Sequence, residues 1–115
     1  MRLQSHIWVS AYLRRVAQEG ASALLVRRGE ASAGAIYIKI SHLDGTGQLF
    51  CPALLLDESA RDERAWASEF GDEPIEEREI DSFVKTQTSY DADIWIIEVE
   101  DRQGRHFLDN QVQTL

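Results

Sequence analysis

"DADIWIIEVEDRQGRHF", residues 91–107, is the stretch of the sequence that decides the fold. In a β-strand, alternate side chains point to the same face of the sheet. The alternation places Trp95, Ile97, Val99 and Asp101 on one face, and Ile94, Ile96, Glu98 and Glu100 on the other. Because both faces are apolar over the first half, residues 93–100 are predicted to form a central strand that is covered on both sides.

Two amphipathic helices are predicted around this strand. In residues 6–19, apolar side chains recur at helical spacing, Ser5 is placed as N-cap, and Gly20 ends the helix. The second helix is predicted over residues 74–88, with Pro74 in its first turn. Its inner face comprises Ile80, Phe83, Val84 and Gln87.

Further strands are predicted over residues 21–28, 34–43 and 48–56. The first two are separated by a short loop that begins at Gly29 and is predicted to close a hairpin. Pro52 cannot donate to a ladder, so the third strand is an edge, is bulged or ends there. Short strands are also considered at "RAWASEF" (64–70) and "RHFLD" (105–109).

This order of elements predicts an α+β fold in one domain, residues 1–115. We expect a two-layer arrangement, with two helices on a mostly antiparallel sheet of about five strands. The last long strand follows a helix, so it can pair parallel to a neighbour and make the sheet mixed.

Composition limits the classes of function. The 115 residues contain no apolar run near the about twenty residues of a membrane span, and the N-terminus lacks a signal-peptide core. We therefore expect a cytoplasmic protein without membrane insertion. The net charge is −8, and residues 57–81 account for all of it, with eleven acids and three arginines. Such a run is typical of a solvated surface and can also mark a docking face.

The carboxylate of Glu98 needs a positively charged partner, because it follows two isoleucines on its own face of the strand. Either an arginine of the preceding strands neutralises it, or it shares a divalent cation with Glu100. After it, the turn from Asp101 to Gly104 presents Arg102 and Arg105, which are suited to a phosphate or carboxylate. Together with Arg28, these residues are the candidate binding site: Arg28, Glu98, Asp101, Arg102 and Arg105.

Other chemistry is weakly supported by the sequence. Two basic dipeptides, Arg14-Arg15 and Arg27-Arg28, share the N-terminal half with aromatic residues, but the net charge of −8 opposes a nucleic-acid partner. Cys51 lies in an apolar run and is predicted to be an inert buried thiol. The histidines are scattered, so we predict no catalytic residue, no metal site and no cofactor.

Three quoted stretches resemble a known family. "IWVSAYLRR", "RRGEASAGAIYIKISHLDGTGQLFCP" and "DADIWIIEVEDRQGRHFLD" are similar to small alphaproteobacterial proteins grouped as domain of unknown function 1491. The resemblance covers most of the chain outside residues 57–72 and the last few residues. It implies a bacterial cytosolic protein with an α+β fold. Its recurring motif positions correspond to Trp8, Arg15, Arg28, Gly34, Trp95, Glu98, Asp101, Arg102 and Arg105.

Two functions are therefore expected from the sequence. The first is a non-enzymatic domain that binds a protein partner or forms a homodimer, with the acidic run and a sheet edge as possible contacts. The alternative is a small enzyme or anion-binding protein with its site around Glu98, Asp101, Arg102 and Arg105.

Overall fold

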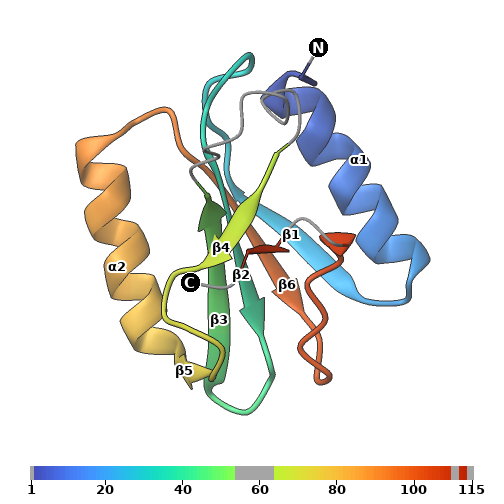
Figure 1. Cartoon of the computed structure of the whole chain (residues 1–115), viewed down its shortest axis with the longest axis vertical. Helices are drawn as coiled ribbons and strands as arrows, with labels where there is room; N and C mark the ends of the chain where they lie inside the picture. Colours follow the sequence, from blue (N-terminus) through green and yellow to red (C-terminus); the bar gives the residue numbers. More distant parts are fainter. Residues whose placement is uncertain (1, 54–63, 110–111, 114–115) are drawn as a thin grey trace.

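The structure is a computed structural model, and it describes residues 2–53, 64–109 and 112–113. Two helices flank a twisted sheet (Figure 1). In chain order the elements are α1 (Ser5–Gln18), β1 (Ser22–Arg27), β2 (Ile36–Ser41), β3 (Thr46–Pro52), β4 (Trp66–Ser68), β5 (Ile75–Glu76), α2 (Glu77–Tyr90), β6 (Trp95–Glu100) and β7 (Val112–Gln113). Among these residues, no helix is long and apolar enough to cross a bilayer.

The sheet is mixed and mostly antiparallel, as expected. Its strand order is β1-β6-β2-β3-β4-β7, and β5 pairs with β3 beside this path. Two pairs are parallel, β2 with β6 and β4 with β7. The α+β class is confirmed, and five of the strands are longer than two residues.

The predicted hairpin between the first two strands is wrong, because β6 lies between β1 and β2. The connecting loop passes over the start of β6 and is bonded to it. Glu30 donates its backbone N–H to the Asp93 carbonyl at 3.0 Å, and Trp95 donates its indole N–H to the Glu30 carbonyl at 2.7 Å. The loop thus connects two strands that are separated by a third. β6 lies between β1 and β2, in the interior of the sheet, as its two apolar faces predicted.

The two helices cover opposite faces of the sheet, where a two-layer arrangement would place both on one face. The larger core joins α1 to the face that bears Ile38, Ile97 and Phe50. The smaller core joins α2 to the face that bears Leu49 and Cys51. Apolar residues on both faces of the central strands make this possible, since each face needs its own cover.

Helix α1 has the predicted core stripe but not the predicted cap. Ser5 is the first helical residue and is fully buried, and its hydroxyl donates to the Gly34 carbonyl at 2.7 Å. The hydroxyl thus fastens the helix to the β1–β2 loop. At the other end the chain leaves the helix through Gly20, whose φ of +83° favours glycine.

Helix α2 begins three residues later than predicted and ends at Tyr90. Ile75 and Glu76, which follow Pro74, form β5 instead and pair with Gly47 and Thr46 of β3. In a first helical turn, the backbone N–H groups of these residues would have no partner within the helix. Pairing with β3 gives backbone groups of Ile75 and Glu76 partners, and this outweighs the tendency of proline to start a helix.

The remaining strand predictions are mixed in outcome. The short strand at Trp66–Ser68 is confirmed, and Pro52 ends β3 opposite Trp66. Residues 105–109 are not a strand, and the last short strand is Val112–Gln113. The predicted extension of the third strand to residue 56 lies outside the described residues.

Candidate functional site

A buried lysine in the middle of β2 gathers three carboxylates from two other elements. The Nζ atom of Lys39 lies 2.8 Å from Asp81 Oδ1, 2.9 Å from Glu98 Oε1 and 3.0 Å from Glu77 Oε1. Burial lowers the pKa of Lys39, but hydrogen bonds to the three carboxylates outweigh it and raise the pKa above its ordinary value. Lys39 therefore remains an ammonium ion, and Glu98 has its neutralising partner.

This ammonium ion occupies the position that a cation shared by the acids would take. Among the described residues, no group of three or more histidine, cysteine, aspartate or glutamate side chains is placed to hold a metal ion. The three carboxylates exceed the single ammonium by two charges, and the Asp81 side chain is 60% exposed. The cluster thus leaves negative charge at the surface.

The cluster forms one wall of a groove between β1 and α2, which we call the β1–α2 groove. Its volume is about 410 Å³. Apolar side chains of β1, α2 and β6 form part of its surface, and Arg27 and Lys85 add positive charge. It is lined by Val26, Arg27, Lys39, Asp81, Val84, Lys85, Thr88, Ile96 and Glu98.

Two large apolar side chains lie exposed beside the groove. Leu24 is 62% exposed and Val26 is 56% exposed, although both belong to a strand of the sheet. Leu24 pairs with Glu98 and therefore shares its face. The register shifts between Leu25 and Arg27, so Val26 is an extra residue, and both Val26 and Arg27 line the groove.

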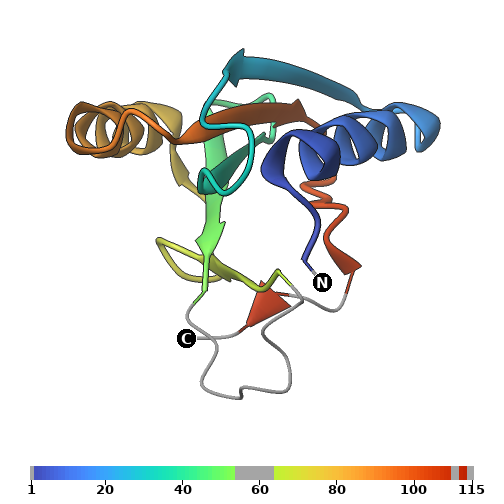
Figure 2. The ribbon, with the colours of Figure 1, turned by 90° about the horizontal axis from the view of Figure 1, so that it is seen from above.

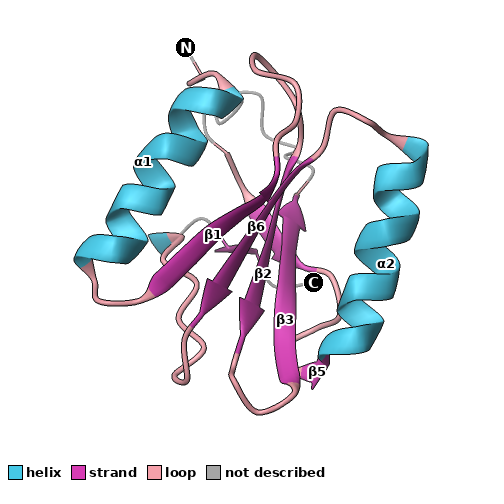
Figure 3. Ribbon diagram, turned by 180° about the vertical axis from the view of Figure 1, so that it is seen from behind, coloured by secondary structure: helices cyan, strands magenta, loops and turns pink. Residues whose placement is uncertain are grey.

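The exposure follows from the position of α2. This helix packs mainly against β3 and β5 and leaves Leu24 and Val26 on the same side of β1 exposed, whereas Ile96 of β6 is buried at the floor of the groove. Seen from behind, these two strands face the viewer with no helix before them (Figure 3). We call this surface the open face; it comprises Leu24, Val26 and the β1–α2 groove.

The predicted site residues do not share one pocket. Asp101 and Arg105 are brought together: Arg105 Nη2 lies 3.0 Å from Asp101 Oδ1, and both Nε and the backbone N–H of Arg105 donate to Oδ2. Arg105 holds the pKa of Asp101 below its ordinary value. The Arg105 guanidinium also lies 5.0 Å from the centre of the Phe107 ring, and Arg102 is exposed in the turn.

Arg28 and Glu98 lie apart from this pair. The Arg28 guanidinium is 5.5 Å from the centre of the Trp95 ring, at the start of β6, whereas Asp101 follows the end of β6. Six residues of strand separate these positions by roughly 20 Å. Glu98 points to the opposite face of the sheet from Trp95. The five residues therefore occupy three places.

Sequence reasoning missed Lys39, Leu24 and Val26. One signal was available for Lys39, because it is the only charged residue in the strand "IYIKIS" (36–41) and stands among apolar residues, as Glu98 does. For Leu24 and Val26 no such signal existed, since an apolar residue in a strand is normally buried. Only the position of α2 leaves them exposed.

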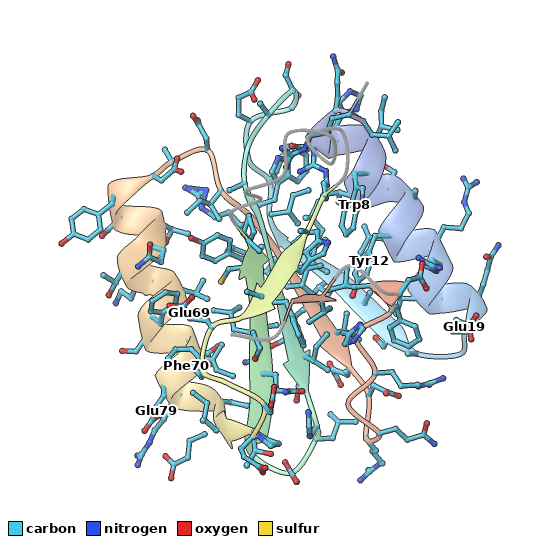
Figure 4. The ribbon with its side chains drawn as sticks, viewed as in Figure 1. Trp8, Tyr12, Glu19, Glu69, Phe70 and Glu79 are labelled. Carbon is cyan, nitrogen blue, oxygen red and sulfur yellow. The ribbon has the colours of Figure 1, made fainter. Side chains whose placement is uncertain are left out.

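The aromatic residues near α1 serve the core. Trp8 and Tyr12 project from α1 toward the sheet and stack with ring centres 5.0 Å apart (Figure 4). The Tyr12 hydroxyl donates to the His106 carbonyl at 2.7 Å, and burial raises the pKa of Tyr12. Arg15 forms an ion pair with Asp109 beside them, and a cavity of about 240 Å³ lies here.

Cys51 is buried, and burial raises the pKa of its thiol to about 12. A thiol with this pKa is almost fully protonated near neutral pH, and the thiolate is the nucleophilic form. The structure thus agrees with an inert core cysteine.

Comparison with known proteins gives a consistent family and fold. The model of the family described as "Protein of unknown function (DUF1491)" matches residues 3–109. No curated protein matches the chain.

Solved structures from alphaproteobacteria are similar over most of their length. A crystal structure of a DUF1491 family protein from Caulobacter crescentus CB15 has 36% sequence identity and a TM-score of 0.81, and the match covers 99% of this chain and 100% of that chain. An NMR structure of a DUF1491 family protein from the same organism has 37% identity and a TM-score of 0.80, with 99% of each chain covered. A solution structure of a protein from A. tumefaciens has 33% identity and a TM-score of 0.74, covering 87% of this chain and 86% of that chain.

Proposed function

The chain belongs to the DUF1491 family of proteins of unknown function, and we propose that it is a non-enzymatic domain that binds a polypeptide chain at its open face. The observation that carries the proposal is the exposure of Leu24 and Val26 on a strand at the margin of the sheet. Apolar side chains on an edge strand expose both hydrophobic surface and unpaired backbone groups, and contact with another chain covers both.

The dimensions of the open face suit a polypeptide. Neighbouring strands lie about 4.8 Å apart, so β1 and the groove floor at β6 together span about 10 Å, roughly the diameter of a helix. An extended segment can instead add to the edge of β1. The groove supplies apolar contacts at Val84 and Ile96 and charged groups of both signs at its walls.

The alternative of an anion-binding site around Glu98, Asp101, Arg102 and Arg105 has less support. Arg105 is already paired with Asp101, and Glu98 lies on the other face of the sheet with Lys39. A cytoplasmic location forms part of the proposal, and the single cysteine, which is buried and unpaired with any other, is in line with it.

Photo-crosslinking in living cells tests the proposal. A photoreactive amino acid is placed at Leu24 and, in a control protein, at Ile7, which is also exposed but lies on α1. We expect a polypeptide adduct from position 24, identified by mass spectrometry, and none of the same species from position 7. The adduct should disappear when Val26→Asp is added. Absence of any adduct at position 24 would contradict binding at the open face.

A further inference from the structure

Strand β1 is the edge of the sheet, and its outer side has no partner strand among the described residues. Seen from above, it forms one margin of the molecule (Figure 2). Its residues Ser22–Val26 carry neither a charge nor a proline, which are common features that prevent one edge strand from pairing with another. The protective features of β1, the bulge at Val26 and the charge of Arg27, both lie at its end.

The two ends of β1 carry opposite charge. Ser22 at its start pairs with Glu100 of β6, which is exposed, and Glu19 lies just before it at the end of α1 (Figure 4). Arg27 and Arg28 stand at its other end. Arg28 lies over Trp95, whereas Arg27 is directed to the groove side.

We propose that β1 pairs antiparallel with β1 of a second copy of the chain, about a two-fold axis near Leu24. This inference rests on the proposed function and names its partner. Such a contact is isologous, so the dimer is closed and does not extend into a filament.

The pattern of side chains is self-complementary in this arrangement. Residues directly opposite each other in an antiparallel pair share a face. With Leu24 opposite its own copy, Ala23 faces Leu25 of the second copy, and Ser22 faces Val26. Every pair within Ser22–Val26 is therefore uncharged, and the exposed side chain of Leu24 gains an apolar neighbour.

The opposite charges at the two ends of β1 favour antiparallel over parallel pairing, and they favour a second copy of the chain as the partner. Arg27 of one chain then lies opposite Ala21 of the other and beside Ser22, two strand spacings or about 10 Å from Glu100. The long arginine and the glutamate side chain span that distance together, and symmetry makes the contact twice. Parallel pairing would instead place the arginines beside each other and the acids beside each other.

Charge reversal with complementation tests the dimer. Sedimentation of the purified chain measures the dissociation constant, which we expect in the micromolar range for so small an interface. Arg27→Glu alone and Glu100→Arg alone should each weaken the dimer by about tenfold or more, because each reverses two contacts at once. When the two variants are mixed, a heterodimer should form, since every contact in it again joins opposite charges.

Two charge reversals outside β1 are the controls. Arg14→Glu on α1 and Glu79→Arg on α2 change the net charge by the same amounts at exposed positions outside β1, and they should leave the dissociation constant unchanged. Hydrogen exchange gives a second readout: the β1 amides that point away from β6 should be protected only at dimer-forming concentrations, whereas those bonded to β6 stay protected throughout.

A monomer at all concentrations would overturn the pairing of β1, as would a dimer that ignores both reversals or variants that fail to recombine. These results are separable from failure of the proposed function. A crosslinked adduct at position 24 that contains a different protein, with a monomeric chain, would retain the proposed function and reject the second copy as partner.

Discussion

Lys39 is the residue on which the chemistry of the groove depends. Its side chain is 9% exposed and bonds carboxylates from α2 and β6, so it ties that helix to the central strand. Asp81 of α2 accepts a hydrogen bond from the Lys39 ammonium at 2.8 Å. A buried ammonium ion needs its partners more than an exposed one, because it has lost its water.

Replacing Lys39 by methionine should lower the free energy of unfolding by about 2 kcal/mol. The change keeps an apolar chain of similar length and leaves three carboxylates without their cation. Removing one partner of a fully buried ion pair costs about 3–5 kcal/mol. The loss expected here is smaller, because the carboxylates retain part of their hydration. Urea unfolding measures it, and Lys85→Met, an exposed lysine at the same groove, should change the value by less than about 0.5 kcal/mol. Equal effects would show that the cluster contributes no specific stability.

Asp101 should contribute a pH-dependent part of the stability. Its pKa is lowered in the folded state by Arg105, so its contribution is present above the unfolded pKa and is lost as pH falls through the lowered folded pKa. Asp101→Asn should therefore cost about 1–2 kcal/mol at pH 7, in line with hydrogen bonds to a charged group, and less at acid pH, as the carboxylate becomes protonated. Unfolding curves recorded from pH 7 down into the acid range test this, with Glu79→Gln as an exposed control. A cost that stays constant across this range would exclude the ion pair as its source.

At the scale of elements, the loop between β1 and β2 is the unusual feature. It separates two strands that are consecutive in the chain, so that β6 can enter between them. Close backbone contact makes this possible: a Cβ at Gly34 would collide with the Asp93 carbonyl oxygen and lie 2.8 Å from the Glu30 oxygen. The requirement for glycine here is steric rather than conformational, because only Gly20, Gly45, Gly71 and Gly104 have positive φ.

Gly34→Ala should therefore destabilise the chain by about 3 kcal/mol, the upper part of the range for overpacking. Gly20→Ala is the matched control, because its Cβ would meet no atom within 4 Å and only the backbone conformation is strained. That strain costs about 1 kcal/mol. Thermal or urea unfolding of the two variants gives the comparison, and a smaller loss at Gly34 than at Gly20 would contradict the tight contact with Asp93.

At the scale of the whole molecule, the acidic run is not a uniform solvated surface. Glu77 and Asp81 from this run turn inward to Lys39, while Glu79 stays exposed on the outside of α2. The uncovered surface lies elsewhere, at Leu24 and Val26 of β1, on the far side of the groove from α2. The charged ends of β1 are therefore better placed to select a partner than the acidic run, because they flank exposed apolar residues. The proposed dimer and its charge-reversal test belong to this scale.

The sequence by itself determined the features that depend on local periodicity. The alternation in residues 93–100 predicted a central strand with Glu98 among apolar residues, and the helical spacing in residues 6–19 predicted the core face of α1. The turn at Asp101–Gly104 was also predicted, and Gly104 donates its N–H to the Asp101 carbonyl at 2.9 Å. These features are encoded by side chains a few residues apart, so they can be read without knowing the neighbours.

Only the tertiary structure decided which strands are neighbours and which apolar residues remain uncovered. Nothing near Gly29 in the sequence shows that β6 enters between β1 and β2, because the contacts come from a strand about sixty residues later. Likewise, Lys39 finds Glu98 through parallel pairing of two distant strands. Leu24 is exposed because α2 covers the other half of that face. Burial and charge pairing depend on what packs against a strand, and that is a property of the assembled sheet rather than of any one segment.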